Sequence, residues 1–269
     1  MTLLLILVGT LLAGIGSVWL AAWLSFGLLS RYTQHMLSLA AGALLATGFL
    51  KLLPEAFESG ASPHALFVTL LVGLVFFFLL DKAELWHHGH EHHHGLSHDR
   101  DHGHAHHGHA HPHHHDPVTG GWAVLAGDSL HCFGDGILIA SAFMADVQLG
   151  AIAALAVLAH EVPHHMGDLV VLRQGERSRH AAVIKVSLAG AVTALGGLVG
   201  YWLVDTLHDQ LPFFLVVASS SFVYVALADL IPQLQKRLST RETLAQVFWL
   251  GFGIAGVLAV GALTGGHAH

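Results

Sequence analysis

Residues 149–172 read LGAIAALAVLAHEVPHHMGDLVVL, an apolar block that contains five ionisable or histidine side chains, namely His160, Glu161, His164, His165 and Asp168. A helix needs about 20 apolar residues to cross the hydrocarbon core of a bilayer. An ionisable side chain at the centre of such a helix costs roughly 2.5–3.5 kcal/mol, so it usually faces the bundle interior and marks an ion pathway. The stretch therefore predicts a membrane helix whose polar residues line a cation site.

Similar apolar blocks fill most of the chain, near 3–28, 34–53, 64–86, 120–145, 181–204, 212–234 and 244–264. Residues 1–29 contain no Lys or Arg, so the first block lacks the basic region of a signal peptide and is expected to be a helix of the mature chain. Only 11% of all residues are charged, against about 25% in an ordinary soluble domain. We therefore expect an all-α membrane protein with eight transmembrane helices. This disfavours a soluble enzyme, and nothing implies nucleic acid as a partner.

The basic residues predict the orientation of these helices, because cytoplasmic loops are enriched in Lys and Arg. Ten of the eleven lie at or near loops that follow odd-numbered helices, and only Lys51 lies on the other side. Both termini are therefore expected outside, with the long connection between the third and fourth helices in the cytoplasm.

A short motif occurs on two oppositely directed helices. Lys51-Leu52-Leu53-Pro54-Glu55 in the second resembles Asp229-Leu230-Ile231-Pro232-Gln233 in the seventh. Secondary transporters often contain inverted repeats around a site at the membrane midplane. The motif predicts an inverted repeat of helices 1–3 and 6–8, although Leu-Leu-Pro is also common at helix ends.

The fourth helix carries a second polar set: Asp128, His131, Cys132 and Asp135 fall on one helical face. A short connector near Asp146 predicts that helices four and five form an antiparallel hairpin. Two residues at equal depth on these helices then have residue numbers that add up to about 295. This places His131 opposite His164 and Asp135 opposite His160.

Imidazoles and carboxylates together suit a borderline cation such as Zn²⁺, whereas Ca²⁺ and Mg²⁺ prefer oxygen alone. Cys132 and Glu161 each follow a histidine by one residue, so their side chains point to a neighbouring position on the helix. A second ion could bind there. Cys132 would favour Zn²⁺ or Cd²⁺ over Mn²⁺, or would act only as a small apolar residue. Gly134, Gly136 and Gly167 are expected to permit close helix packing.

An enzyme is the main alternative, because His160-Glu161-Val162-Pro163-His164 also satisfies the H-E-x-x-H zinc motif of metalloproteases. Against it, Pro163 lies inside the motif, and the fourth helix supplies several ligands where a protease needs one and an open water position.

These motifs resemble the ZIP (Zrt/Irt-like) family of divalent metal transporters, especially its histidine-rich subfamily. The family's H-N-F-x-D-G appears as His131-Cys132-Phe133-Gly134-Asp135-Gly136, and its H-E-x-P-H-E-x-G-D appears as residues 160–168. Cys132 stands where the family has Asn, His165 where it has Glu, and Lys51 where it has His. The motifs around Pro54 and Pro232 are also similar to the family's.

The resemblance implies helices in a 3+2+3 arrangement, a binuclear centre between helices four and five, and import of metal into the cytoplasm. The implied first site is His131, Asp135, His160 and His164, and the implied second site is Cys132, Asp135 and Glu161. Asp128, His165 and Asp168 are further candidate ligands. The expected substrate is Zn²⁺, with Cd²⁺, Fe²⁺, Mn²⁺, Co²⁺ and Ni²⁺ as alternatives.

The connection at 87–119 is rich in histidine: residues 87–115 contain 16 in 29 positions. Such a segment cannot bury a core of its own, so we expect a disordered cytoplasmic loop that binds metal or serves only as a linker. It divides the chain into helices 1–3 (1–86), the metal-site pair (120–172) and helices 6–8 (181–264). Exporters of the cation diffusion facilitator class also have histidine loops, but usually have six spans and a folded domain after the last.

The expected location is the plasma membrane, in a bacterium the inner membrane, with the lipid bilayer as partner. Gly196-xxx-Gly200 and the glycines of residues 251–256 fit packing within the bundle or a homodimer.

Overall fold

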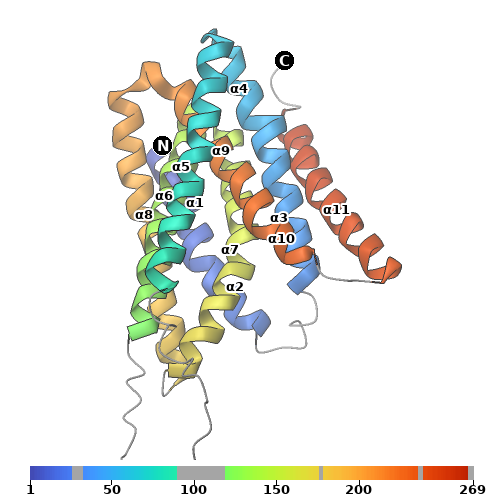
Figure 1. The fold of residues 1–269 in the computed structure, drawn as a ribbon. Coiled ribbons are helices and arrows are strands. Elements are labelled where there is room, and N and C mark those ends of the chain that lie inside the picture. Colours follow the sequence, from blue (N-terminus) through green and yellow to red (C-terminus); the bar gives the residue numbers. More distant parts are fainter. Residues whose placement is uncertain (26–32, 90–118, 176–177, 236–238, 266–269) are drawn as a thin grey trace, which may run out of the picture.

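The computed structural model describes residues 1–25, 33–89, 119–175, 178–235 and 239–265, which form a bundle of long helices (Figure 1). No strand occurs among these described residues. The histidine-rich connection at 90–118 lies outside them. The helical segments fall into eight successive spans: α1 (Thr2–Leu11), η1 (Leu12–Gly16) and α2 (Ser17–Ser25); α3 (Thr33–Thr47), η3 (Gly48–Leu52) and α4 (Leu53–Glu58); α5 (Pro63–Gly89); α6 (Thr119–Ala145); α7 (Val147–Gly175); α8 (Arg179–Thr206); η4 (His208–Gln210), α9 (Leu211–Tyr224), η5 (Val225–Leu230) and α10 (Ile231–Leu234); and α11 (Thr240–Gly265).

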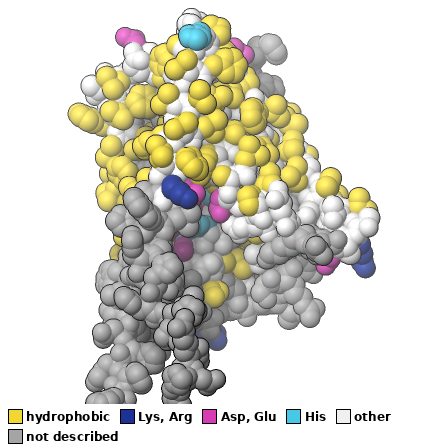
Figure 2. Space-filling model, viewed as in Figure 1, with side chains coloured by type: hydrophobic (Ala, Val, Ile, Leu, Met, Phe, Trp, Pro, Cys, Tyr) yellow, Lys and Arg dark blue, Asp and Glu magenta, His cyan; other side chains and the backbone are white. Residues whose placement is uncertain are grey.

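The predicted membrane-spanning architecture is confirmed. Seven of the described spans are long and apolar enough to cross a membrane, and α6, the remaining one, is 27 residues long and carries part of the polar constellation. The outward faces of α5 and α11 are apolar and exposed, as Phe67, Leu71, Phe248 and Phe252 illustrate. Figure 2 shows hydrophobic side chains covering most of the visible surface above the grey atoms. An exposed apolar surface of this extent is typical of a protein that spans a membrane.

The expected hairpin of α6 and α7 is formed by a turn at Asp146. The Oδ1 atom of this residue accepts hydrogen bonds from the backbone N–H groups of Gln148, at 2.8 Å, and Leu149, at 3.0 Å. An Asp side chain in this position satisfies amides that the first turn of a helix leaves unpaired. The cap fixes where α7 begins and therefore which residues of the two helices lie at equal depth.

The packing partners agree with the inverted repeat. The second span packs on the eighth through α3 and α11, and the seventh packs on the third through α9 and α5. In the same way α6 packs on α8, and α7 packs on the first span. The π-helical segments η3 and η5 lie at matching places, beside Pro54 and Pro232 of the repeated motif. Each of these helix contacts therefore has a counterpart in the other repeat, with helices 1–3 corresponding to helices 6–8 and α6 corresponding to α7.

Glycine lets α6 approach α8 closely. A Cβ atom on Gly136 would overlap the Thr193 carbonyl oxygen, and one on Gly196 would overlap the Phe133 carbonyl oxygen. Gly200 likewise packs against Ile137, so the Gly196-xxx-Gly200 motif is used inside the bundle. The same expectation was wrong for Gly134 and Gly167, whose Cβ positions face open space.

The close approach predicts that Gly136→Ala destabilises the bundle. The added methyl group meets backbone, which cannot rotate away, and overpacking of this kind typically costs about 1–3 kcal/mol. Thermal unfolding of the purified protein in detergent should show a lower midpoint for this variant. Gly251→Ala is the matched control, because its Cβ would meet nothing within 4 Å. Equal midpoints for the two variants would contradict the packing described.

Candidate metal centre

The facing sides of α6 and α7 bring together four side chains that we name the first group: His131, Asp135, His160 and Glu161. The Nε2 atom of His160 lies 3.3 Å from Asp135 Oδ2 and 3.2 Å from Glu161 Oε1. The Nε2 atom of His131 lies 3.2 Å from the same Glu161 oxygen. Imidazole nitrogens and carboxylate oxygens therefore converge on one point between the helices.

A backbone contact orients His160 for this position. Its Nδ1 atom lies 3.3 Å from the carbonyl oxygen of Ala156, one turn earlier in α7. A carbonyl only accepts, so Nδ1 carries the proton and, in the neutral ring, Nε2 keeps a free lone pair. Histidines that bind metal usually donate their other ring N–H to such an acceptor.

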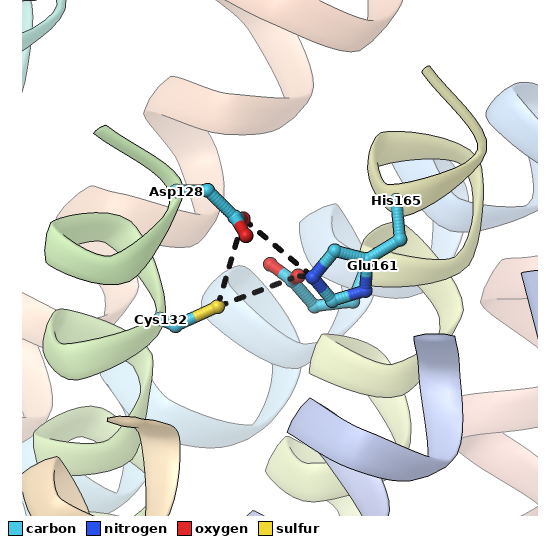
Figure 3. A group of neighbouring side chains, drawn as sticks. All are labelled: Asp128, Cys132, Glu161 and His165. Carbon is cyan, nitrogen blue, oxygen red and sulfur yellow. Dashed lines mark hydrogen bonds and ion pairs between the residues drawn. The ribbon is translucent and has the colours of Figure 1, made fainter. Parts of the chain in front are cut away.

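A second group lies beside the first and consists of Asp128, Cys132, Glu161 and His165 (Figure 3). The Nε2 atom of His165 is 3.1 Å from Glu161 Oε2 and 3.5 Å from Asp128 Oδ1. The Sγ atom of Cys132 is 3.7 Å from Asp128 Oδ1 and 3.9 Å from Glu161 Oε2. All four residues are buried.

Glu161 belongs to both groups. Its Oε1 atom faces His131 and His160, whereas its Oε2 atom faces His165 and Cys132. The side chain is 1% exposed. One carboxylate can thus contact two neighbouring cations, one through each oxygen.

His164 is placed differently from the other histidines. It is half-exposed, and its Nε2 atom lies 3.6 Å from Asp128 Oδ1 and 3.8 Å from Asp168 Oδ2. Its ring centroid is 5.4 Å from that of His131. The depth rule for the hairpin is therefore confirmed, since His131 lies beside His164 and Asp135 beside His160.

The grouping differs from the one that the resemblance implied. His164 lies outside the first group, where Glu161 takes its place, and Asp135 does not reach Cys132, which is instead surrounded by Asp128, Glu161 and His165. His164 lies one turn beyond His160 in α7, and its Nε2 atom lies beside Asp128 and Asp168 instead. Equal depth therefore does not decide which side chains share a centre.

A cavity of about 380 Å³ leads to the first group and is lined by His131, Asp135, His160 and His164. Asp81 of α5 and Tyr224, Asp229 and Gln233 of the seventh span also line it, and the Tyr224 hydroxyl donates a hydrogen bond to Asp81 Oδ2 at 2.9 Å. Asp81 and Gln233 lie near the ends of their spans, so the cavity extends toward the end of the bundle where α5 ends and α6 begins. Figure 2 shows acidic and histidine side chains gathered at that end of the apolar face.

The bundle is closed on the other side of the first group. Beyond Asp135 in α6 and before His160 in α7, toward the turn at Asp146, buried apolar side chains fill the interior: Leu44, Leu52, Ile139, Phe143, Val157 and Phe222. The Gln148 side chain donates to the Gly261 carbonyl at 2.8 Å, and Lys51 Nζ lies against the same glycine. Among the residues that the structure describes, the centre is therefore open toward one end of the bundle and packed toward the other.

Sequence reasoning missed three residues that orient a ligand or line the cavity. Ser17 of the first span lies 3.0 Å from Nδ1 of His165, and a serine in an apolar helix gives no signal of such a role. Asp81 and Tyr224 line the cavity from α5 and α9.

Buried carboxylate oxygens are crowded in the centre: Asp128 Oδ2 has no hydrogen-bond partner, and Asp135 Oδ2, Glu161 Oε1 and Asp168 Oδ2 have only histidine nitrogens beside them, at 3.2–3.8 Å. A buried polar atom without a partner typically costs about 1–3 kcal/mol, and more when it is charged. A set of acceptors this dense fits cations, which would satisfy several of them at once.

Comparisons with known proteins agree with this arrangement. The family described as ZIP Zinc transporter matches residues 1–261. The protein named Zinc transporter ZIP10 from Danio rerio is 33% identical over 148 residues, 52% of this chain and 18% of the relative. Zinc transporter ZIP4 from Homo sapiens is 33% identical over 143 residues, 53% of this chain and 21% of the relative. The alignments thus span about a fifth of these relatives' lengths. By its match over almost the whole length and its paired metal-ligand helices, the chain belongs to the ZIP zinc transporter family.

Proposed function

We propose that this protein carries a divalent cation, foremost Zn²⁺, across a membrane through the centre between α6 and α7. The observation that carries this proposal is the position of Glu161, which joins two buried ligand groups inside a membrane-spanning bundle. A carboxylate shared by two ion positions lets one ion arrive while the other leaves. Family membership and the names of the relatives support the same function.

The donor atoms favour zinc among the divalent ions. Zn²⁺ accepts imidazole nitrogen, carboxylate oxygen and thiolate sulfur, most often in tetrahedral sites. Mg²⁺ and Ca²⁺ require oxygen donors and larger coordination numbers. Cd²⁺, Fe²⁺, Mn²⁺, Co²⁺ and Ni²⁺ are competing substrates.

The proposed direction is import. Basic residues near loops that follow odd-numbered spans favour a cytoplasmic location for the end of the bundle where α5 ends. The cavity extends toward this end, so the described conformation is one that faces the cytoplasm. In this proposal both termini are outside, and the plasma membrane is the location.

The histidine-rich connection is proposed to receive the metal. It joins α5 to α6, and both helices line the cavity, through Asp81 and His131 respectively. Imidazoles at varied spacing bind Zn²⁺ at many weak positions. An ion that leaves His164 would therefore meet further ligands.

A protease is disfavoured by the surroundings of Glu161. In an H-E-x-x-H enzyme the glutamate acts as a base on a water bound at an open metal position. Here Glu161 is buried and contacts histidines on both sides, and His160 and His164, the two histidines of that motif, fall in different ligand groups. We therefore propose transport without catalysis.

His160→Ala should abolish uptake of Zn²⁺ by vesicles that contain the purified protein. The substitution removes a ligand that contacts both Asp135 and Glu161. His208→Ala, at an exposed side chain, should transport as the wild type does. If vesicles with the wild-type protein move no metal but cut a model peptide, and the cleavage depends on Glu161, the transport proposal is wrong and the protein is a protease.

Deletion of residues 90–115 should change the rate or the saturation of uptake without abolishing it, because the centre lies entirely on α6 and α7. Uptake is measured over a range of Zn²⁺ concentrations, with a Gly/Ser segment of the same length as the control for connection length. A complete loss of uptake in both variants would mean that the histidines are part of the obligatory pathway.

A further inference from the structure

Two of the positions at which this chain departs from the family motif lie in the same ligand group. Cys132 and His165 come from different helices, yet both contact the same two carboxylates, Asp128 and Glu161 (Figure 3). The four donor atoms lie within 4.8 Å of one another. Sulfur and imidazole nitrogen therefore replace two harder donors around one point.

The distances suit a tetrahedral ion. With Zn–S near 2.3 Å and Zn–N or Zn–O near 2.0 Å, donor atoms around tetrahedral zinc lie about 3.3–3.5 Å apart. The four contacts in the second group range from 3.1 Å, between His165 and Glu161, to 3.9 Å, between Cys132 and Glu161. These four contacts match tetrahedral spacing to within a few tenths of an ångström, and all four donor atoms lie within 4.8 Å of one another.

The burial of this second group indicates a binding site rather than ordinary packing of the helix interior. Cys132 and His165 are both 0% exposed. The buried Asp128 Oδ2 atom has no hydrogen-bond partner. Because an unpaired buried carboxylate oxygen is costly, this atom points to a ligand that is positively charged.

Ser17 determines which nitrogen of His165 is available. The Ser17 hydroxyl donates its single hydrogen to the Gly14 carbonyl at 2.6 Å. At 3.0 Å from Nδ1 of His165, the same oxygen can then only accept, so the proton of the neutral ring is on Nδ1. The lone pair on Nε2 is left facing Asp128 and Glu161.

The backbone of the first span holds Ser17 in place. Ser17 directly follows the π-helical segment η1, and Gly14 within that segment is packed so tightly against Gly190 of α8 that a side chain would collide with the Gly190 backbone. The orientation of His165 therefore depends on a third helix outside the hairpin that supplies the donors.

We propose that Asp128, Cys132, Glu161 and His165 form a soft-metal position, selective for Zn²⁺ and Cd²⁺ over Mn²⁺, and that Ser17 is the positioning residue that holds His165 ready to bind. This inference rests on the proposed transport function and gives its metal preference. On binding, the Cys132 thiol loses its proton and coordinates as thiolate, the form that binds metals.

The test is a Co²⁺ titration of the full chain in detergent, because thiolate bound to Co²⁺ gives a charge-transfer band in the near ultraviolet. The wild type should show this band and Cys132→Ser should lose it. Ser17→Ala should need about 10–100-fold more Co²⁺ to reach half of the band, as expected when the partner of a metal-binding histidine is removed. Cd²⁺ should displace Co²⁺ from the wild type, and Mn²⁺ should not.

Ser38→Ala is the matched control, because Ser38 is equally buried but donates only to the Gln34 carbonyl of its own helix. It should titrate as the wild type does, and its thermal midpoint should match that of Ser17→Ala. A wild type that binds Co²⁺ without the band, or a Ser17→Ala variant with wild-type affinity, would overturn the inference. If the protein shows the charge-transfer band but transports no metal, the transport proposal is overturned and the metal position remains supported.

Discussion

The burial of acidic side chains in the middle of a membrane bundle is the constraint on which the rest of this structure depends. Asp128, Asp135, Glu161 and Asp168 are at most 9% exposed. Buried carboxylates without compensation would cost several kcal/mol each. The histidines of α6 and α7 and the cations that they would bind offset this cost. Close packing of α6 on α8 holds the helix pair together around them.

The two ends of the bundle differ in a way that suits alternating access. On one side of the first group a cavity of about 380 Å³ reaches the end where α5 ends, and on the other side apolar side chains fill the interior. Inverted repeats supply two arrangements of related helices, so the closed side of one state can become the open side of the other. The π-helical segments beside Pro54 and Pro232 lie where the two repeats would bend.

The sequence was sufficient to predict the eight spans, because apolar length and loop composition are local properties. The pairing of Asp135 with His160 and of His131 with His164 followed from the short turn at Asp146. The division of the ligands into groups around Glu161 could not be predicted, because it depends on helix rotation and on side-chain conformations. Neither could the contact of Ser17 with His165, which lies 148 residues away in the chain.

The central claim is that Glu161 joins two metal positions. The most direct measurement is anomalous X-ray diffraction at the zinc edge, on crystals of this protein grown with Zn²⁺. The account predicts two peaks on either side of the Glu161 carboxylate, one among His131, Asp135 and His160, and the other among Asp128, Cys132 and His165. Each ion should lie about 2.0–2.3 Å from its donor atoms. Zinc found only at peripheral histidines, with the space around Glu161 empty, would contradict the account.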